Sequence, residues 1–116
     1  MGVVTNTTDK HQNCINACAK CVQACYECLN ACLNEPDVAA RKNCISTLFE
    51  CAMICQQAVA YMSMSAGFSK DLCALCAKIC EKCAQECNMF QDDHCQKCAQ
   101  VCQECAAECK KMAGIQ

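Results

Sequence analysis

The sequence predicts an all-α protein, an antiparallel up-down-up-down four-helix bundle with cysteines lining the core. Nineteen cysteines occur in 116 residues. In three segments they follow one another at alternating steps of four and three residues, and a fourth segment keeps this rhythm with fewer thiols. Such steps hold every sulfur on one face of an α-helix, where a bundle core normally carries leucine and isoleucine. Short connections between the segments favour antiparallel neighbours.

The first helix is expected at about residues 9–34. Asp9 is a candidate N-cap, and Pro36 blocks continuation of the helix and suits the first turn of the next one. The cysteine face of this helix consists of Cys14, Cys18, Cys21, Cys25, Cys28 and Cys32.

The second helix is expected at about residues 37–61 and is the poorest in thiols. Residues 63–67 interrupt its pattern. Its core stripe reads Cys44, Leu48, Cys51, Cys55, Ala58 and Met62.

The third and fourth helices are expected at about residues 69–88 and 93–112. Ser69 is a candidate N-cap for the third helix, and Asp92 or Asp93 for the fourth. Their cysteine faces are Cys73, Cys76, Cys80, Cys83 and Cys87, then Cys95, Cys98, Cys102, Cys105 and Cys109.

Length and charge narrow the class of protein further. A chain of 116 residues fits a single domain over residues 1–116. The formal net charge of −2 predicts no nucleic-acid partner, and no stretch approaches the roughly 18–20 apolar residues of a membrane span. The chain start lacks the basic and apolar regions of a signal peptide. An odd number of thiols within helical repeats argues against a disulfide framework. We therefore expect a cytoplasmic protein with free thiols.

The density of thiols predicts a metal-binding protein. Cysteine buries less apolar surface than leucine and is open to oxidation, so stability alone does not explain such a core. Thioredoxin-like and iron–sulfur sites lack their usual sequence context here. Four thiolates around Zn²⁺ carry a net charge of −2, whereas soft Cu(I) takes two or three thiolates that can bridge ions. Roughly one Cu(I) per cysteine leaves the core nearly neutral, on the order of 19 ions. A zinc- or cadmium-binding metallothionein-like protein is the alternative, and an enzyme is not expected.

Sulfurs four residues apart on one helix can hold an ion between them. Cys44, Cys73 and Cys95 fall outside such pairs and would bridge. The eight pairs are 14/18, 21/25, 28/32, 51/55, 76/80, 83/87, 98/102 and 105/109.

The chain resembles the bacterial copper storage proteins over residues 9–112. The run from Asp92 to Cys98, continued through Cys109, is similar to the last helix of that family. The resemblance is to the cytosolic branch. It implies high-capacity Cu(I) storage in a homotetramer of bundles, loaded through one end. A copper chaperone or a small thiol is a candidate copper donor. A second apolar stripe that includes Phe49 and Met53 also favours an oligomer.

Each end of the predicted bundle carries softer ligands beside the thiols. His94 and Met89 fall at one end, and His11, Met62 and Met112 at the other. Imidazole and thioether groups can bind Cu(I) weakly and pass it inward, or they can simply pack. The resemblance favours the end with His94 and Met89 for copper uptake, although His94 is the one histidine near that turn.

Overall fold

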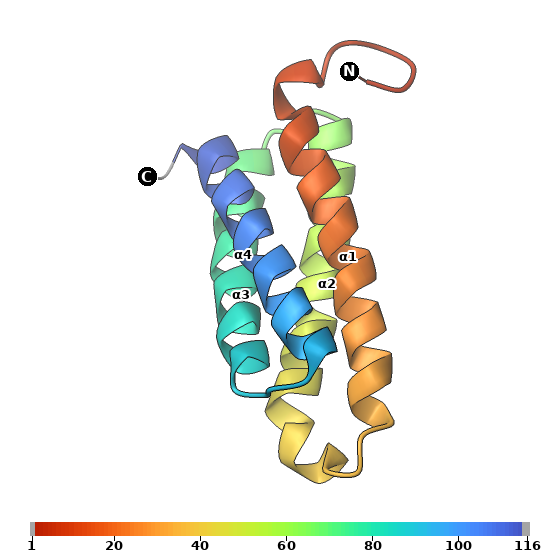
Figure 1. Ribbon diagram of the computed structural model, residues 1–116. Helices are drawn as coiled ribbons and strands as arrows, with labels where there is room; N and C mark the ends of the chain where they lie inside the picture. The colour runs from red at the N-terminus through yellow and green to blue at the C-terminus, as the bar shows by residue number, and fades with distance from the viewer. Residues whose placement is uncertain (1, 115–116) are drawn as a thin grey trace.

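The structure, a computed structural model, describes residues 2–114 as a bundle of four antiparallel helices (Figure 1). The predicted all-α four-helix bundle is confirmed. The helices are α1 (Gln12–Leu33), α2 (Lys42–Ser63), α3 (Ser69–Asn88) and α4 (Asp93–Ala113), and the short 3₁₀ segments η1 (Asp9–His11) and η2 (Val38–Arg41) precede α1 and α2. Along residues 2–114, no helix has the length and apolar character needed to cross a membrane.

The first two helices begin later than the sequence predicts, because a 3₁₀ turn comes first in each case. Asp9 and Ser69 are not the N-cap residues predicted from the sequence, because His11 and Phe68 occupy the N-cap positions of α1 and α3. The predicted position of Asp92 is confirmed, although its side chain makes no cap hydrogen bond. Asp9 accepts a bond from the Gly2 backbone at 2.8 Å, and the Ser69 hydroxyl donates to the Ala66 carbonyl at 2.7 Å. Asp92 is the N-cap residue of α4, but its carboxylate is held elsewhere, as described below.

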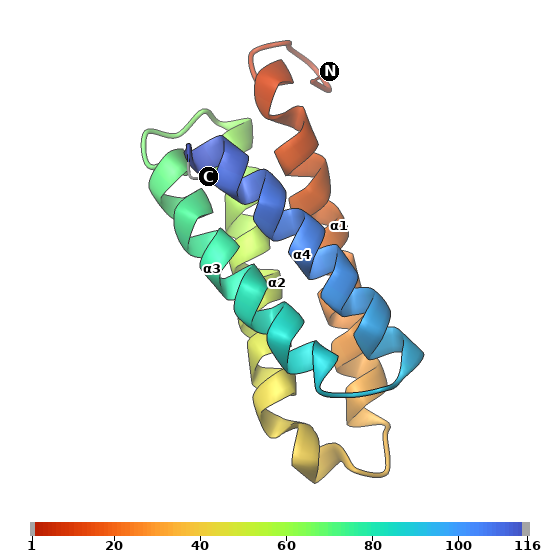
Figure 2. The same ribbon diagram turned by 60° about the vertical axis from the view of Figure 1, so that its left-hand side comes forward.

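The topology gives the bundle two distinct ends (Figures 1 and 2). The α1–α2 connection and the α3–α4 turn lie together at one end, which we call the His94 end. The α2–α3 loop and both ends of the described chain lie at the other, the His11 end (Figure 1). The α1–α2 connection extends further along the bundle axis than the α3–α4 turn, so η2 lies beyond the first turn of α4 (Figure 1).

The core consists mainly of sulfur. All nineteen cysteines are buried, with Leu48 and Met62 as the large apolar side chains among them. Every thiol is free. Within residues 2–114, Arg41 is the one charged side chain in the buried class, with 4% exposure. The core therefore contains many potential ligands and a single fixed countercharge.

Candidate metal centre

The largest sulfur cluster runs through the bundle from the His11 end past its middle. Neighbouring Sγ atoms in it lie 3.6–3.9 Å apart and come from all four helices. We call it the inner network. Its eleven members are Cys14, Cys18, Cys21, Cys25, Cys51, Cys55, Cys76, Cys80, Cys102, Cys105 and Cys109.

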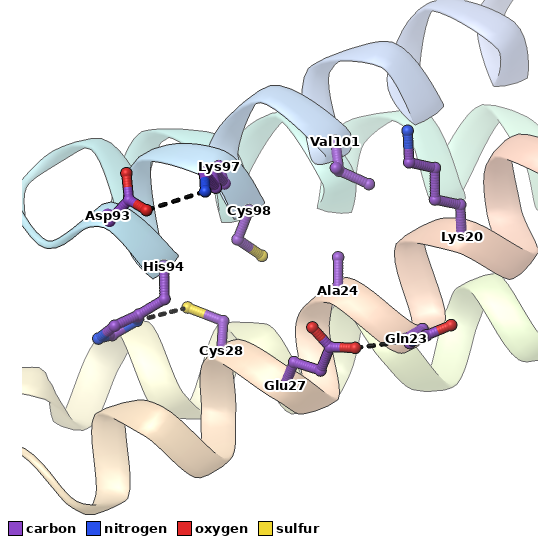
Figure 3. A pocket seen from close by; sticks show the side chains of 10 residues that line it. All are labelled: Lys20, Gln23, Ala24, Glu27, Cys28, Asp93, His94, Lys97, Cys98 and Val101. Atoms are coloured by element: carbon purple, nitrogen blue, oxygen red, sulfur yellow. Dashed lines mark hydrogen bonds and ion pairs between the residues drawn. The ribbon is translucent and has the colours of Figure 1, made fainter.

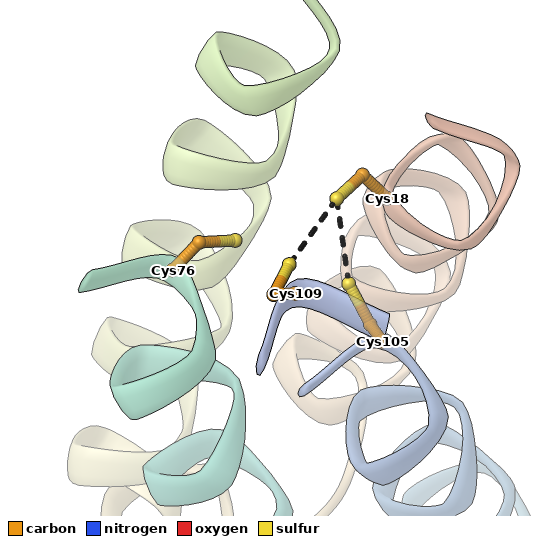
Figure 4. A group of neighbouring side chains, drawn as sticks. All are labelled: Cys18, Cys76, Cys105 and Cys109. Carbon is orange, nitrogen blue, oxygen red and sulfur yellow. Dashed lines mark hydrogen bonds between the residues drawn. The ribbon is translucent and has the colours of Figure 1, made fainter. Parts of the chain in front are cut away.

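Within the inner network the thiols gather in fours. In one quartet, Cys18 and Cys76 face Cys105 and Cys109, with all sulfurs within 4.8 Å of one another (Figure 4). Two further quartets share members with their neighbours. The second quartet shares Cys105 with the first and Cys21 with the third. Their members are Cys21, Cys55, Cys80 and Cys105, and Cys21, Cys25, Cys51 and Cys102. Shared sulfurs suit bridging ligands in a multinuclear cluster better than separate closed sites.

The shortest sulfur contacts join different helices. Three of the eight predicted pairs on a single helix have Sγ atoms at 3.9–4.0 Å, namely 21/25, 28/32 and 76/80. Contacts between helices reach 3.6 Å, as between Cys18 and Cys109. The geometry therefore favours clusters built across the bundle over ions held by one helix turn.

A separate group of ligands closes the His94 end. The Sγ atoms of Cys28 and Cys32 lie 3.8 and 3.7 Å from that of Cys95. His94 adds its Nδ1 atom, 3.6 Å from Cys28 and 3.5 Å from Cys95. These four side chains have ligand atoms within 4.8 Å of one another. We call them the His94 cluster.

Glu35 sets the orientation of the histidine ring. Its Oε2 atom lies 2.9 Å from His94 Nε2. A carboxylate only accepts hydrogen bonds, so Nε2 carries the proton in the neutral ring and Nδ1 keeps its lone pair. That lone pair faces the sulfurs of Cys28 and Cys95. A carboxylate that accepts a hydrogen bond from the second ring nitrogen is a common way to orient a metal-binding imidazole.

Arg41 covers the same cluster with a buried guanidinium. Its Nη1 atom donates to Cys32 at 3.6 Å and to Cys95 at 3.5 Å. Nη1 also lies 2.5 Å from Asp92 Oδ2, an ion pair without hydrogen-bond geometry, and Nε donates to Asp37 at 2.8 Å. The guanidinium carbon lies 4.5 Å from the centre of the Phe90 ring. Arg41 thus ties η2 to the α3–α4 turn while its charge faces two thiols.

The charged groups around this cluster shift one another's proton affinity. The ion pair with Asp92 raises the pKa of Arg41 above its already high value, so the guanidinium stays charged. Arg41 in turn lowers the pKa of Asp92. Burial, with a hydrogen bond to Cys32, raises the pKa of Cys95 to about 12. The free thiol is therefore protonated at neutral pH, and a bound metal ion must displace its proton.

The remaining cysteines lie between or beside these groups. Cys44 and Cys87 form a pair at 3.8 Å, and Cys73 lies within 4.8 Å of Cys14 and Cys109. Cys83 and Cys98 are also buried.

The other predicted end ligands differ widely in setting. Met89, at the C-terminal end of α3, is 64% exposed, whereas Met62 is fully buried. His11, Met62 and Met112 line one hollow at the His11 end. The structure thus brings His94 onto the thiols but leaves Met89 on the surface.

Sequence reasoning missed Arg41 and Glu35. A signal for Arg41 was present, because one further step of three back from Cys44 in the α2 stripe reaches it. Glu35 has no such signal, since its role depends on how closely the two turns approach.

The fold and the buried thiols together define a cysteine-lined four-helix bundle that can hold many soft metal ions. Residues 7–114 match the family described as copper storage protein. The chain belongs to this family, which confirms the resemblance predicted from the sequence.

Two solved structures and one curated protein illustrate the similarity. Copper storage protein 3 of Bacillus subtilis, in a Cu(I)-bound structure, has a TM-score of 0.85 and 45% identity over 88% of this chain and 96% of its own. The cytosolic copper storage protein of Streptomyces lividans with five coppers has a TM-score of 0.89 and 32% identity over 94% of this chain and 96% of its own. The uncharacterised cysteine-rich protein YhjQ of Bacillus subtilis is 46% identical over 74 residues, 64% of this chain and 68% of its own.

Proposed function

We propose that this protein stores Cu(I), with its nineteen thiols as ligands in multinuclear clusters and a capacity near one ion per thiol. One observation carries the proposal: nineteen buried thiols share a core that holds a single buried countercharge, Arg41. Buried thiolates without compensation are prohibitively costly. The bound ions must therefore neutralise the sulfurs almost one for one, and Cu(I) does so at equal numbers of ions and thiolates.

Zinc fits this core less well. Each quartet could surround one Zn²⁺, but a closed site of four thiolates keeps a charge of −2. Arg41 lies against Cys32 and Cys95 and cannot compensate several such sites along the bundle. The sharing of Cys21 and Cys105 between quartets also prevents separate closed sites.

Copper uptake is assigned to the His94 end. His94 combines a part-exposed ring with a lone pair aimed at two thiols, so it can receive an ion from solvent and pass it to sulfur. Met89 is exposed at the same end and could make an early, weak contact. Met62, buried beside the His11 end, acts in packing, while His11 and Met112 line a hollow that could hold late-binding ions.

The surface supports assembly into a homotetramer. Four large apolar side chains on α1 and α2 remain exposed, which is unfavourable for a single bundle in water: Tyr26, Leu33, Phe49 and Met53.

The Streptomyces lividans relative is described as cytosolic, and a cytoplasmic setting would keep free thiols reduced in this protein as well. The role proposed is storage and buffering of copper, not catalysis, with a chaperone or a small thiol as donor.

Anaerobic titration of the reduced protein with Cu(I), against a competing chelator, tests the proposal. We expect saturation near 19 ions per chain and luminescence from clustered Cu(I) thiolates. Protein with alkylated thiols is the matched control and should bind almost none. Saturation at four or five ions, without luminescence, would favour the metallothionein-like alternative.

A further inference from the structure

A pocket opens between α1 and α4 on the side of the bundle, next to His94 (Figure 3). Its volume of about 670 Å³ falls within the range typical of small-molecule sites. Small side chains create it, because Ala24 on α1 and Val101 on α4 leave the space between the helices unfilled. Cys28 and Cys98 also line the pocket, one from each helix (Figure 3).

This pocket is where two thiols of the core meet solvent together. Fifteen of the nineteen cysteines have no exposed surface. Cys28 and Cys98 keep 1% and 2% exposure and both line the pocket, whereas Cys44, with 1%, does not. Cys14 keeps 4%, but it stands alone in a hollow at the opposite end of the bundle. Transfer of copper between sulfurs requires the receiving thiol to touch the incoming complex, so a pocket lined by two thiols is the better receiver.

The rim of the pocket carries both signs of charge. Lys20 has no ion-pair partner among residues 2–114. Lys97 Nζ lies 2.9 Å from Asp93 Oδ2, and both side chains are exposed to solvent. Glu27 accepts a hydrogen bond from Gln23 at 2.7 Å. A ligand that carries both ammonium and carboxylate groups would find partners for each. The concave shape suits a small molecule better than the flatter surface of a protein.

We propose that this pocket is the docking site of the copper donor, a low-molecular-mass amino-acid thiol that carries Cu(I), and that Cys28 and Cys98 receive the ion. The inference rests on the storage function proposed above and names the donor for it. In a donor complex of two thiolates and one Cu(I), each exchange breaks a bond between copper and a donor sulfur and forms one to a cysteine Sγ atom. The cysteine proton leaves with the departing donor thiol. Copper remains Cu(I), and no electron is transferred.

Stopped-flow transfer from the Cu(I) complex of glutathione tests this assignment. In the unmodified protein the initial rate should saturate as the donor concentration rises. Ala24→Phe fills the pocket without removing a thiol, and we expect at least a tenfold lower initial rate with the same final capacity. Val101→Phe fills the pocket from the opposite helix and should act in the same direction. Ala60→Phe adds the same ring at an exposed position on α2 and serves as the matched control, with an unchanged rate.

Two measurements avoid any dependence on core packing. Lys20→Glu alters only the rim and should raise the donor concentration at half-saturation by about threefold. S-methylglutathione, which cannot exchange copper, should bind the apo protein, shift the NMR signals of the Ala24 and Val101 methyl groups, and inhibit transfer competitively.

The outcomes separate the donor site from the storage function. Normal rates in both pocket-filling variants, or no binding of S-methylglutathione, would overturn the donor site while a capacity near 19 ions leaves storage intact. Rates that never saturate with glutathione would also overturn it and point to a protein donor. A low capacity in the unmodified protein would overturn both proposals.

Discussion

The His94 cluster and the inner network hold thiols in opposite chemical settings. The inner network is sulfur alone, with eleven Sγ atoms in contact across four helices. The His94 cluster has three thiols and an imidazole beneath the guanidinium of Arg41, and three carboxylates hold the imidazole and the guanidinium in place. A ligand set of mixed chemistry can bind and release an ion, whereas shared sulfurs favour retention. We therefore infer that the inner network sets the number of ions bound and that the His94 end sets the rate of loading.

The largest effect is expected from Arg41→Met, which removes the fixed charge at the His94 end. Loss of one partner from a fully buried ion pair costs about 3–5 kcal/mol. Asp37 and Asp92 keep 51% and 27% exposure, so we expect a loss of about 2 kcal/mol in the free energy of unfolding of the reduced apo protein. Chemical denaturation followed by circular dichroism measures it.

Lys97→Met is the matched control for Arg41→Met. The Lys97–Asp93 pair is almost fully exposed, so its loss should change the free energy of unfolding far less than the loss of Arg41. Equal stability of the Arg41→Met variant and the unmodified protein would mean that Arg41 does not tie the two turns together.

His94→Ala should slow the loading of copper and leave capacity unchanged. Without the imidazole lone pair, an arriving ion has no part-exposed ligand beside Cys28 and Cys95, and we expect about a tenfold lower initial rate. Anaerobic stopped-flow mixing with Cu(I) measures this rate. His11→Ala provides the same change at the opposite end and should leave the initial rate unchanged. A slower rate for His11→Ala instead would move copper uptake to the His11 end.

Cys55→Ala should produce the reverse pattern. Cys55 contacts the sulfurs of Cys76, Cys80 and Cys105 at 3.7–3.8 Å and lies far from His94 along the bundle. We expect the capacity to fall by about one or two ions, since each sulfur can bridge more than one Cu(I), while the initial rate stays the same. Titration and stopped-flow mixing on one preparation give both values. A lower rate at full capacity would contradict the division between the two regions.

The sequence predicts the inner network better than the His94 cluster. Alternating steps of three and four identify every buried thiol, because helix geometry alone places these residues on one face. The same steps do not identify the quartets, which depend on the axial offset between neighbouring helices. Arg41 is in phase with the α2 stripe, yet an arginine in a core position is not expected without its partners. Those partners, Asp92 and Phe90, come from a turn about fifty residues later in the chain. Glu35 is likewise recognisable only once both turns are in place.

The smallest effect is expected from acid, and it concerns the His94 end alone. Arg41 lowers the pKa of Asp92 below its usual value of 3.8. The carboxylate therefore stabilises the folded apo protein fully above pH 3.8, and this contribution is lost as the pH falls through the lower pKa of the folded state. The difference in stability between the unmodified protein and Asp92→Asn should be present at pH 5 and should shrink below pH 3.8. Asp93→Asn is the matched control, because Asp93 is 82% exposed and, among residues 2–114, pairs with Lys97 alone. Denaturation curves at several pH values measure the difference, and a gap as large at pH 3 as at pH 5 would show that Asp92 acts by packing and not by charge.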